Sequence, residues 1–348
     1  MELNVMTRLP RKQLILAWKI QAGVGLIEIM IALVIGLILI AGVSWIFLDS
    51  KQTYRLQDAQ SRMQENARFA LELLTNDIRM TGFSGCANLS SITPNVIVSA
   101  PIIPLTTAAT AATGNDAVSP SWNPLLSATL GGLSSPPLAG TDVITVQFSQ
   151  GCGAHLKGNM AVATDGIQIM SPNSCGIDAG DALMISDCVA ADVFRATGTS
   201  GGAPTETVAH ANLSKTYQQD AELFTFASRT YYIANGAGGQ PSLWRLDNTT
   251  ATGVDNPLEL VEGVENMQIL YGEDTNGDRI PNQYLTVNSV STLANVVAVR
   301  ASLLLRTLDD NLLPLVQTYS YNGATVNATD RRLRRTFTTT VNLRNRSP

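Results

Sequence analysis

The amino-acid sequence predicts an α+β protein in which one long N-terminal helix, partly transmembrane, packs on a mainly antiparallel β-sheet head. Three observations lead to this fold class. Residues 29–48 are apolar and uncharged, residues 49–81 place apolar side chains at helical spacing, and several segments beyond residue 140 alternate apolar and polar side chains as strands do. The predicted organisation is a leader over 1–23, the helix over 24–82, and a β-rich head with long loops over 83–348.

Charge is distributed unevenly along the 348 residues. The chain has 23 Lys and Arg against 28 Asp and Glu, a formal net charge of −5. Residues 1–23 hold four basic side chains and one acidic one and so carry +3, which leaves −8 for the rest. This acidic body argues against a nucleic-acid partner.

The apolar run over residues 29–48 is long enough to cross a bilayer. At about 1.5 Å per residue, a helix of this length spans about 30 Å, the thickness of the hydrocarbon core. A secretory signal peptide has a shorter apolar region and a small-residue cleavage site, which this run lacks. Because basic residues precede the span, we expect a cytoplasmic N-terminus and a translocated C-terminal body.

Directly before this run, the segment Gly23-Val24-Gly25-Leu26-Ile27-Glu28 places a carboxylate at the membrane edge. An intramembrane carboxylate is costly and normally has a partner. The segment resembles the class III signal of type IV prepilins, although Val24 replaces the usual aromatic residue. The resemblance implies cleavage after Gly23 by a prepilin peptidase, methylation of the new Val24 amine, and neutralisation of a neighbouring subunit's amine by Glu28. A plain signal anchor with an incidental glutamate is the alternative.

Beyond the span, residues 49–81 contain no Pro or Gly, so the helix is expected to continue past fifty residues. Gly82 and Gly85 then end it. Its outer half is amphipathic, with one stripe facing the head. The stripe consists of Leu56, Ala59, Met63, Ala67, Leu71, Leu74 and Ile78.

The head is expected to be β-rich. Residues 87–140 are rich in Ser, Thr, Ala, Pro and Gly and predict long loops with few regular elements. Strands are predicted over 141–148, 297–305 and 333–343, each with one apolar parity. Residues 231–233 and 243–245 flank NGAGGQPS and predict a hairpin. We expect polar side chains on one sheet face and the long helix on the other.

Four segments of the chain, in this order, resemble the PilW family of type IV pilus minor pilins. The resemblance implies a low-abundance subunit that helps to initiate, assemble or tip the pilus. Its partners would be other minor and major pilins and a tip adhesin. The segments are RFALELLTNDIRMTGFSGC (68–86), AGDALMISDC (179–188), NMQILYGEDTNGD (266–278) and RRTFTTTVNLRNR (334–346).

The four cysteines, Cys86, Cys152, Cys175 and Cys188, predict two disulfides in an exported head. None lies in a CxxC pair, so a zinc site is not indicated. Three connectivities are open. The short separation favours Cys175–Cys188, which would leave Cys86–Cys152; buried free thiols are the alternative.

No catalytic constellation is present, since the sequence has no triad pattern, no GxSxG and no glycine-rich phosphate loop. We therefore expect no enzymatic activity. One loop is a candidate for structural Ca²⁺: Asp274, Asn276 and Asp278 alternate as the first ligands of a calcium loop do. Arg279 stands where such a loop needs Gly, so a solvated Asx-type turn is favoured.

Three functional hypotheses follow. The first is a minor pilin that resides in the inner membrane by a single span, with its head in the periplasm, and then enters the pilus filament. The second is a minor pseudopilin of a type II secretion system, which shares the N-terminal signal. The third is a signal-anchored periplasmic binding protein or enzyme, which would remain uncleaved at Gly23 and would need a polar pocket.

Overall fold

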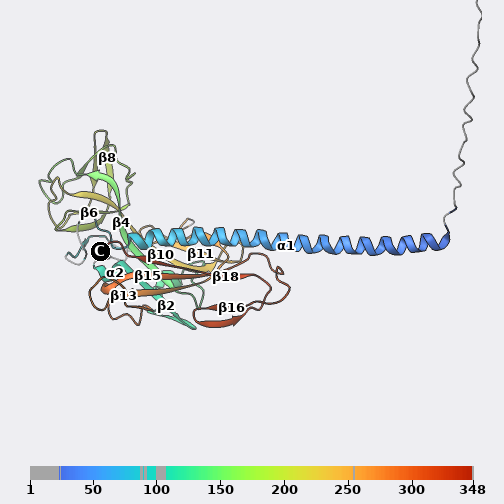
Figure 1. Ribbon diagram of the computed structural model, residues 1–348. Helices are drawn as coiled ribbons and strands as arrows, with labels where there is room; N and C mark the ends of the chain where they lie inside the picture. The colour runs from blue at the N-terminus through green and yellow to red at the C-terminus, as the bar shows by residue number, and fades with distance from the viewer. Residues whose placement is uncertain are drawn as a thin grey trace, which may run out of the picture. The chain divides into compact units, whose positions relative to one another are not determined.

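The computed structural model describes residues 23, 25–86, 89, 92–98, 107–253 and 255–346 (Figure 1). The chain forms two compact units, residues 1–54 and residues 55–348. Val24 and residues 1–22 of the predicted leader lie outside the described residues.

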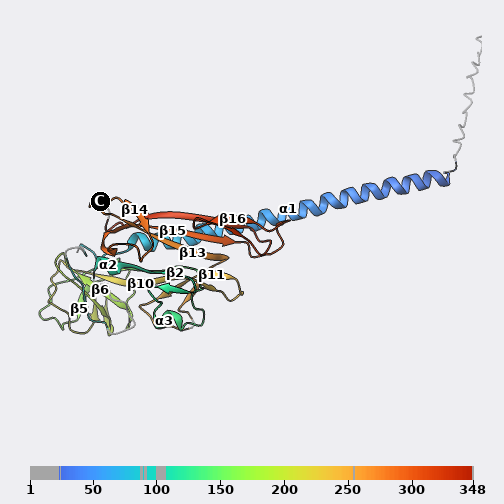
Figure 2. The same ribbon diagram turned by 90° about the horizontal axis from the view of Figure 1, so that it is seen from below.

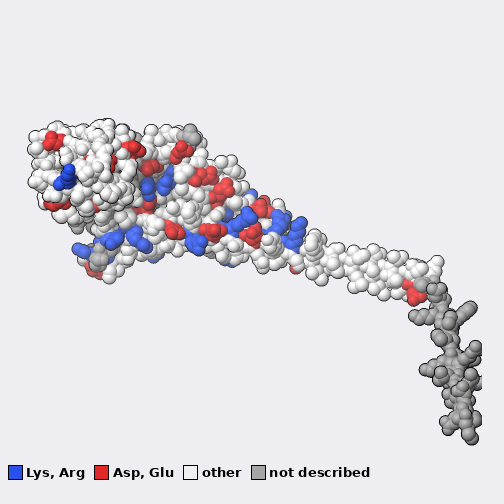
Figure 3. Space-filling view, turned by 90° about the horizontal axis from the view of Figure 1, so that it is seen from above, with Lys and Arg blue, Asp and Glu red and all other residues white. Residues whose placement is uncertain are grey.

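Helix α1 (Leu26–Met80) has 55 residues, and its N-terminal part is apolar and uncovered. Its most apolar window has a mean hydropathy of 2.9 and is 0% buried, so the helix is long and apolar enough to cross a membrane. Figure 3 shows this part as a surface with almost no charge apart from acidic atoms near its start. The prediction of one long helix is confirmed.

The outer half of α1 buries one stripe in the head, as its spacing predicted. Met63, Ala67, Leu74 and Ile78 are all buried. The helix ends at Met80. Two residues later, Gly82 has a φ of +77°, a left-handed conformation that favours glycine. The last carbonyls have partners, because Asn345 Nδ2 donates to the Met80 and Thr81 carbonyls.

The larger sheet of the head has nine strands in the order β1-β7-β6-β10-β4-β2-β3, and β11 joins β10 to β12. The long antiparallel pair of β4 and β10 is its centre. The predicted hairpin is confirmed, since Tyr232 pairs with Trp244 across β10 and β11. The strands are β1 (Asn95–Val96), β2 (Ala112–Val118), β3 (Ser121–Asn123), β4 (Val143–His155), β6 (Ala182–Ser186), β7 (Ala191–Arg195), β10 (Glu222–Asn235), β11 (Pro241–Asp247) and β12 (Leu258–Glu262).

A second antiparallel sheet has the order β14-β13-β15-β18. Strands β16 and β17 form a separate two-stranded hairpin. The predicted parity of residues 297–305 holds in part. Arg300 and Ser302 are half-buried, but Ala298 and Leu304 of the same parity are buried. The apolar parity is buried throughout, at Val297, Val299, Ala301, Leu303 and Leu305. The elements are β13 (Val264–Glu273), β14 (Gln283–Leu285), the 3₁₀ helix η1 (Leu293–Asn295), β15 (Val296–Arg306), β16 (Thr318–Tyr321), β17 (Ala324–Asn327) and β18 (Arg334–Asn342).

The principal core lies between the outer half of α1 and the two sheets (Figure 2). Leu74 and Ile78 of α1 meet Phe148 of β4, Tyr231 of β10 and Leu303 of β15 in one cluster of buried side chains. The helix therefore contributes directly to the stability of the head, because burying each large apolar side chain contributes about 1.5–3 kcal/mol.

The segment between β4 and β10 forms a lobe of its own (Figure 1). A three-stranded sheet of β5 (Ile167–Met170), β9 (Thr205–Ala209) and β8 (Gly198–Gly202) belongs to it. A second cluster of buried side chains, including Ile169 and Phe194, fills its interior.

Two expectations for the head are corrected. Residues 87–140, predicted as loops, contain β1, β2, β3 and the short helices α2 (Ala108–Ala111) and α3 (Ala128–Gly131). The three strands extend the large sheet, and the two short helices pack on the face that was expected to be solvated. Ala111 of α2 clusters there with Phe224, and Leu130 of α3 clusters with Val143 and Tyr232. As a result the polar parity of β4 is buried as well, with Gln147 and Ser149 at 0% exposure. Ser149 Oγ meets its hydrogen-bonding need by donating to the Phe83 carbonyl at 2.9 Å.

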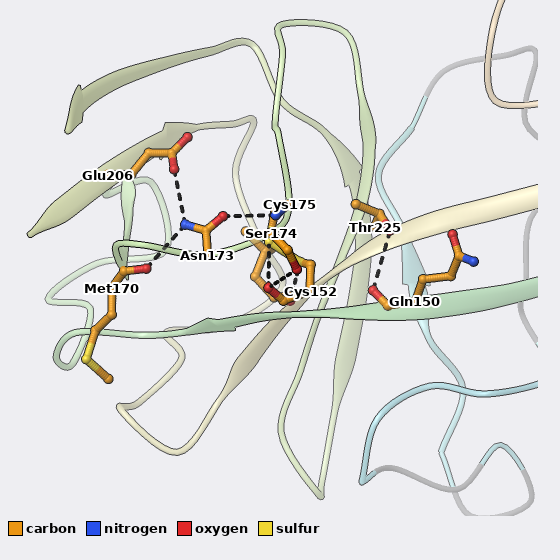
Figure 4. The surroundings of a disulfide bond; sticks show 9 residues. Gln150, Cys152, Met170, Asn173, Ser174, Cys175, Glu206 and Thr225 are labelled. Carbon is orange, nitrogen blue, oxygen red and sulfur yellow. Dashed lines mark hydrogen bonds between the residues drawn. A yellow bond between two sulfur atoms is a disulfide. The ribbon is translucent and has the colours of Figure 1, made fainter. Parts of the chain in front are cut away.

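The disulfide pairing expected from the sequence is wrong. The structure joins Cys86 to Cys188 and Cys152 to Cys175, with Cα–Cα distances of 5.0 and 4.9 Å. Ser174 N donates to the Cys152 carbonyl at 3.0 Å, which aligns the 171–176 turn with β4 (Figure 4). The prediction relied on short sequence separation. The fold instead brings Cys86, after the end of α1, beside Cys188 in the β6–β7 turn.

Candidate assembly segment and buried anchors of the head

The candidate assembly segment starts at Gly23 and includes the first turn of α1. Gly23 and Glu28 are both exposed, and Val24, the predicted methylation site, lies outside the described residues. Glu28 N donates to the Gly25 carbonyl at 2.9 Å, so the helical backbone is established at this residue. A carboxylate in the first turn also interacts favourably with the positive end of the helix dipole.

Glu28 is the only charged residue between Leu26 and Leu48. The apolar side chains beside it are uncovered, with Leu26 at 78% and Ile27 at 72% exposure. A carboxylate in such a surface becomes costly once lipid or protein covers the helix, unless a cation accompanies it. The segment can therefore place one negative charge at a fixed depth in an apolar bundle.

The head holds α1 through a buried ion pair that sequence analysis missed. Arg229 Nη1 donates to both carboxylate oxygens of Asp77 at 2.8 and 3.0 Å, and Tyr231 Oη donates to Oδ2 at 2.6 Å. Burial alone would lower the pKa of Arg229, but the neighbouring Asp77 outweighs burial and raises it. The signal in the sequence was an aspartate placed on the apolar stripe, between Leu74 and Ile78.

A second buried carboxylate, Asp142, connects the two sheets. Its oxygens accept from Ala117 N of β2 and Ile269 N of β13, both at 2.8 Å. Burial, together with repulsion from Asp116, raises the pKa of Asp142 to about 6, although the two backbone donors act in the opposite direction. Sequence analysis also missed this link between the sheets, since a single Asp at a strand end has no distinctive pattern.

The 274–282 loop brings the three predicted calcium ligands together, but most of their oxygens already accept hydrogen bonds. Asp274 accepts from the backbone N–H groups of Asn276, Gly277 and Arg279. Burial would raise the pKa of Asp274, and these donors outweigh it and lower the pKa. Asn276 Nδ2 donates to Asp278 Oδ2 at 3.0 Å. The geometry is that of an Asx-type turn, and calcium binding stays a prediction.

Two models of known families match the chain. Residues 230–345 match the type IV pilus-assembly protein W family, PilW. Residues 18–44 match the prokaryotic N-terminal methylation motif. The first match extends from β10 to the residues after β18 and includes the whole second sheet. No curated protein and no solved structure matches the chain.

Proposed function

We propose that this pilin-like protein of the type IV pilus, which carries a PilW domain and a methylation motif, is a minor pilin. In this proposal a prepilin peptidase cleaves it after Gly23 and methylates Val24. The protein then waits in the inner membrane with its head in the periplasm, and it enters a filament that it helps to initiate, assemble or tip. Its partners are other minor and major pilins and a tip adhesin, and its role is structural rather than catalytic.

The observation that carries this proposal is the uncovered apolar surface of α1 with a single carboxylate at its start. Covering the seventeen large apolar side chains exposed between Leu26 and Leu48 stabilises the protein by on the order of tens of kcal/mol. A membrane provides that cover before assembly, and the helices of other subunits provide it in a filament. Both environments suit the same surface, so a subunit can pass from one to the other.

Glu28 gives the bundle its register. A buried carboxylate and a buried amine are tolerated only together, because either one alone costs several kcal/mol. The carboxylate of Glu28 would pair with the methylated amine of a neighbouring subunit's Val24. Only one axial offset between two helices satisfies both charges, so the pair selects that offset.

Glu28→Ala tests the proposal. We expect the variant to insert and to be cleaved, but to enter filaments poorly and to prime few of them. The matched control is Glu72→Ala, which removes an exposed glutamate from the outer half of the same helix. Normal filament number and normal incorporation of Glu28→Ala would refute the pairing. If the protein supports secretion rather than piliation, it is a pseudopilin of a type II secretion system.

A further inference from the structure

A pocket of about 460 Å³ opens on the head where α1 ends. Its polar lining includes three arginines, Arg279, Arg344 and Arg346, and a single carboxylate, Asp274. Arg279 comes from the 274–282 loop, and the other two follow β18. Segments far apart in the sequence therefore bring three guanidinium groups to one pocket.

Arg346 is the most deeply placed of the three. Its Nη1 donates to the carbonyls of Leu293 at 2.7 Å and Val296 at 3.0 Å. Its Nη2 is buried and has no hydrogen-bond partner among the described residues. Burial of the guanidinium lowers the pKa of Arg346 to about 10. A buried donor without an acceptor costs about 1–3 kcal/mol, more when it is charged.

The positive charge of the pocket is not balanced from within. Across the described parts of the chain, no ion pair involves Arg279, Arg344 or Arg346. The carboxylate of Asp274 already accepts three backbone N–H groups of its own loop. Among the described residues the lining thus keeps an excess of positive charge, with the side chains of Arg279 and Arg344 exposed.

The end of α1 does not account for these arginines. Cations near a helix C-terminus favourably offset its dipole, but the last carbonyls are bound by other groups. Arg344 contributes its backbone N–H to the Arg79 carbonyl at 3.3 Å, and Asn345 binds the next two carbonyls. Arg279 has a φ of +65°, a left-handed conformation that disfavours side chains. A bulky cation in this conformation is the kind of local strain that occurs at ligand sites.

We infer that this pocket binds a carboxylate, held by the exposed guanidinium groups of Arg279 and Arg344, while the charge of Arg346 adds to the positive potential of the lining. Guanidinium forks match the planar geometry of a carboxylate and form charge-assisted hydrogen bonds with it. The volume admits more than a single ionic group, so the carboxylate belongs to a small dicarboxylic acid or to an acidic side chain of another protein. This inference is independent of the proposed function.

Binding is tested on the full-length protein in detergent by calorimetric titration and thermal unfolding. The probes are succinate and the tripeptide Gly-Glu-Gly with an acetylated N-terminus and an amidated C-terminus, so that its side chain is the sole carboxylate; phosphate and chloride are compared at matched ionic strength. We expect saturable binding of succinate, of the tripeptide or of both, and the preferred probe identifies the source of the carboxylate. Tighter binding of phosphate than of either carboxylate would overturn the assignment, as would the absence of saturation above the chloride baseline.

Variants locate the binding. Arg344→Gln and Arg279→Gln change exposed side chains, so the head should fold. Each is expected to raise the dissociation constant about tenfold, because each removes a charge-assisted contact. The control is Lys157→Gln, which removes one exposed positive charge from the lobe and should leave binding unchanged. If the arginine variants bind as the control does, the pocket is not the site.

Discussion

The ion pair between Asp77 and Arg229 should determine how firmly α1 is held in the head. Asp77 is 7% exposed, and its carboxylate serves both Arg229 and the hydroxyl of Tyr231, which is 1% exposed. Asp77→Ala removes the acceptor from both groups at once. Arg229 then keeps a largely buried charge without its counter-ion, and Tyr231 keeps a buried donor without a partner.

The expected loss follows from these two orphaned groups. Removing one partner of a buried ion pair costs about 3–5 kcal/mol. The Arg229 side chain retains 20% exposure, which gives partial access to water, so we expect the lower part of this range, about 3–4 kcal/mol. For a head of this size, that loss lowers the melting temperature by roughly 6–12 °C.

Chemical unfolding of the full-length protein in detergent, followed by near-UV circular dichroism, measures this loss. The control is Asp58→Ala, which breaks the exposed Asp58–Arg62 pair on the same helix and should cost less than about 1 kcal/mol. In a double-mutant cycle with Arg229→Met, the coupling to Asp77 should exceed about 1 kcal/mol. Equal stability of the Asp77→Ala and Asp58→Ala variants would show that the Asp77–Arg229 pair does not hold α1 in the head.

Three further predictions concern the disulfides, pH and calcium. Cys175→Ser should destabilise the head by about 3 kcal/mol and Cys188→Ser by about 5, since the second bridge closes the longer loop; equal stability of the oxidised and reduced wild type would contradict both values. The raised pKa of Asp142, about 6 against 3.8, means that the folded state binds this proton more tightly than the unfolded state does. The stabilisation by protonated Asp142 is therefore fully present below pH 3.8 and is lost as pH rises to about 6. The loss is at most about 3 kcal/mol. The difference in unfolding free energy between wild type and Asp142→Asn, followed across this pH range, measures it. Should the 274–282 loop bind calcium, millimolar Ca²⁺ will raise the melting temperature of wild type but not of Asp274→Asn, and no shift in either protein would leave the loop a simple turn.

The spacing of apolar residues predicted the elements in which each face of the helix or strand meets one kind of environment. The apolar run is exposed all round, whereas the stripe of Met63, Ala67, Leu74 and Ile78 is the buried face of a half-exposed helix. In residues 297–305 the apolar parity is buried, with Arg300 and Ser302 half-buried on the other. The 231–245 hairpin was recognisable because two strand patterns flank a glycine-rich turn. Glu28 was recognisable because one charge stands out in an apolar run.

Long-range packing decided the rest. The second face of the large sheet is covered by α2 and α3, short helices whose uncharged, small residues have no helical periodicity. The disulfides follow the fold, so sequence separation gave the wrong pairing. Asp77 and Asp142 became significant only when strands remote in sequence brought Arg229 and the N–H of Ile269 to them.

Prepilin processing and entry into a filament are the two events on which the proposed function depends. Mass spectrometry of the N-terminal peptide, from purified membranes and from sheared filaments of the same cells, detects both events. We expect a methylated Val24 terminus in both fractions. A terminus at Met1, or at Met6 if translation starts at this second methionine, with no peptide in filaments, would contradict the proposed function and indicate a fixed membrane anchor.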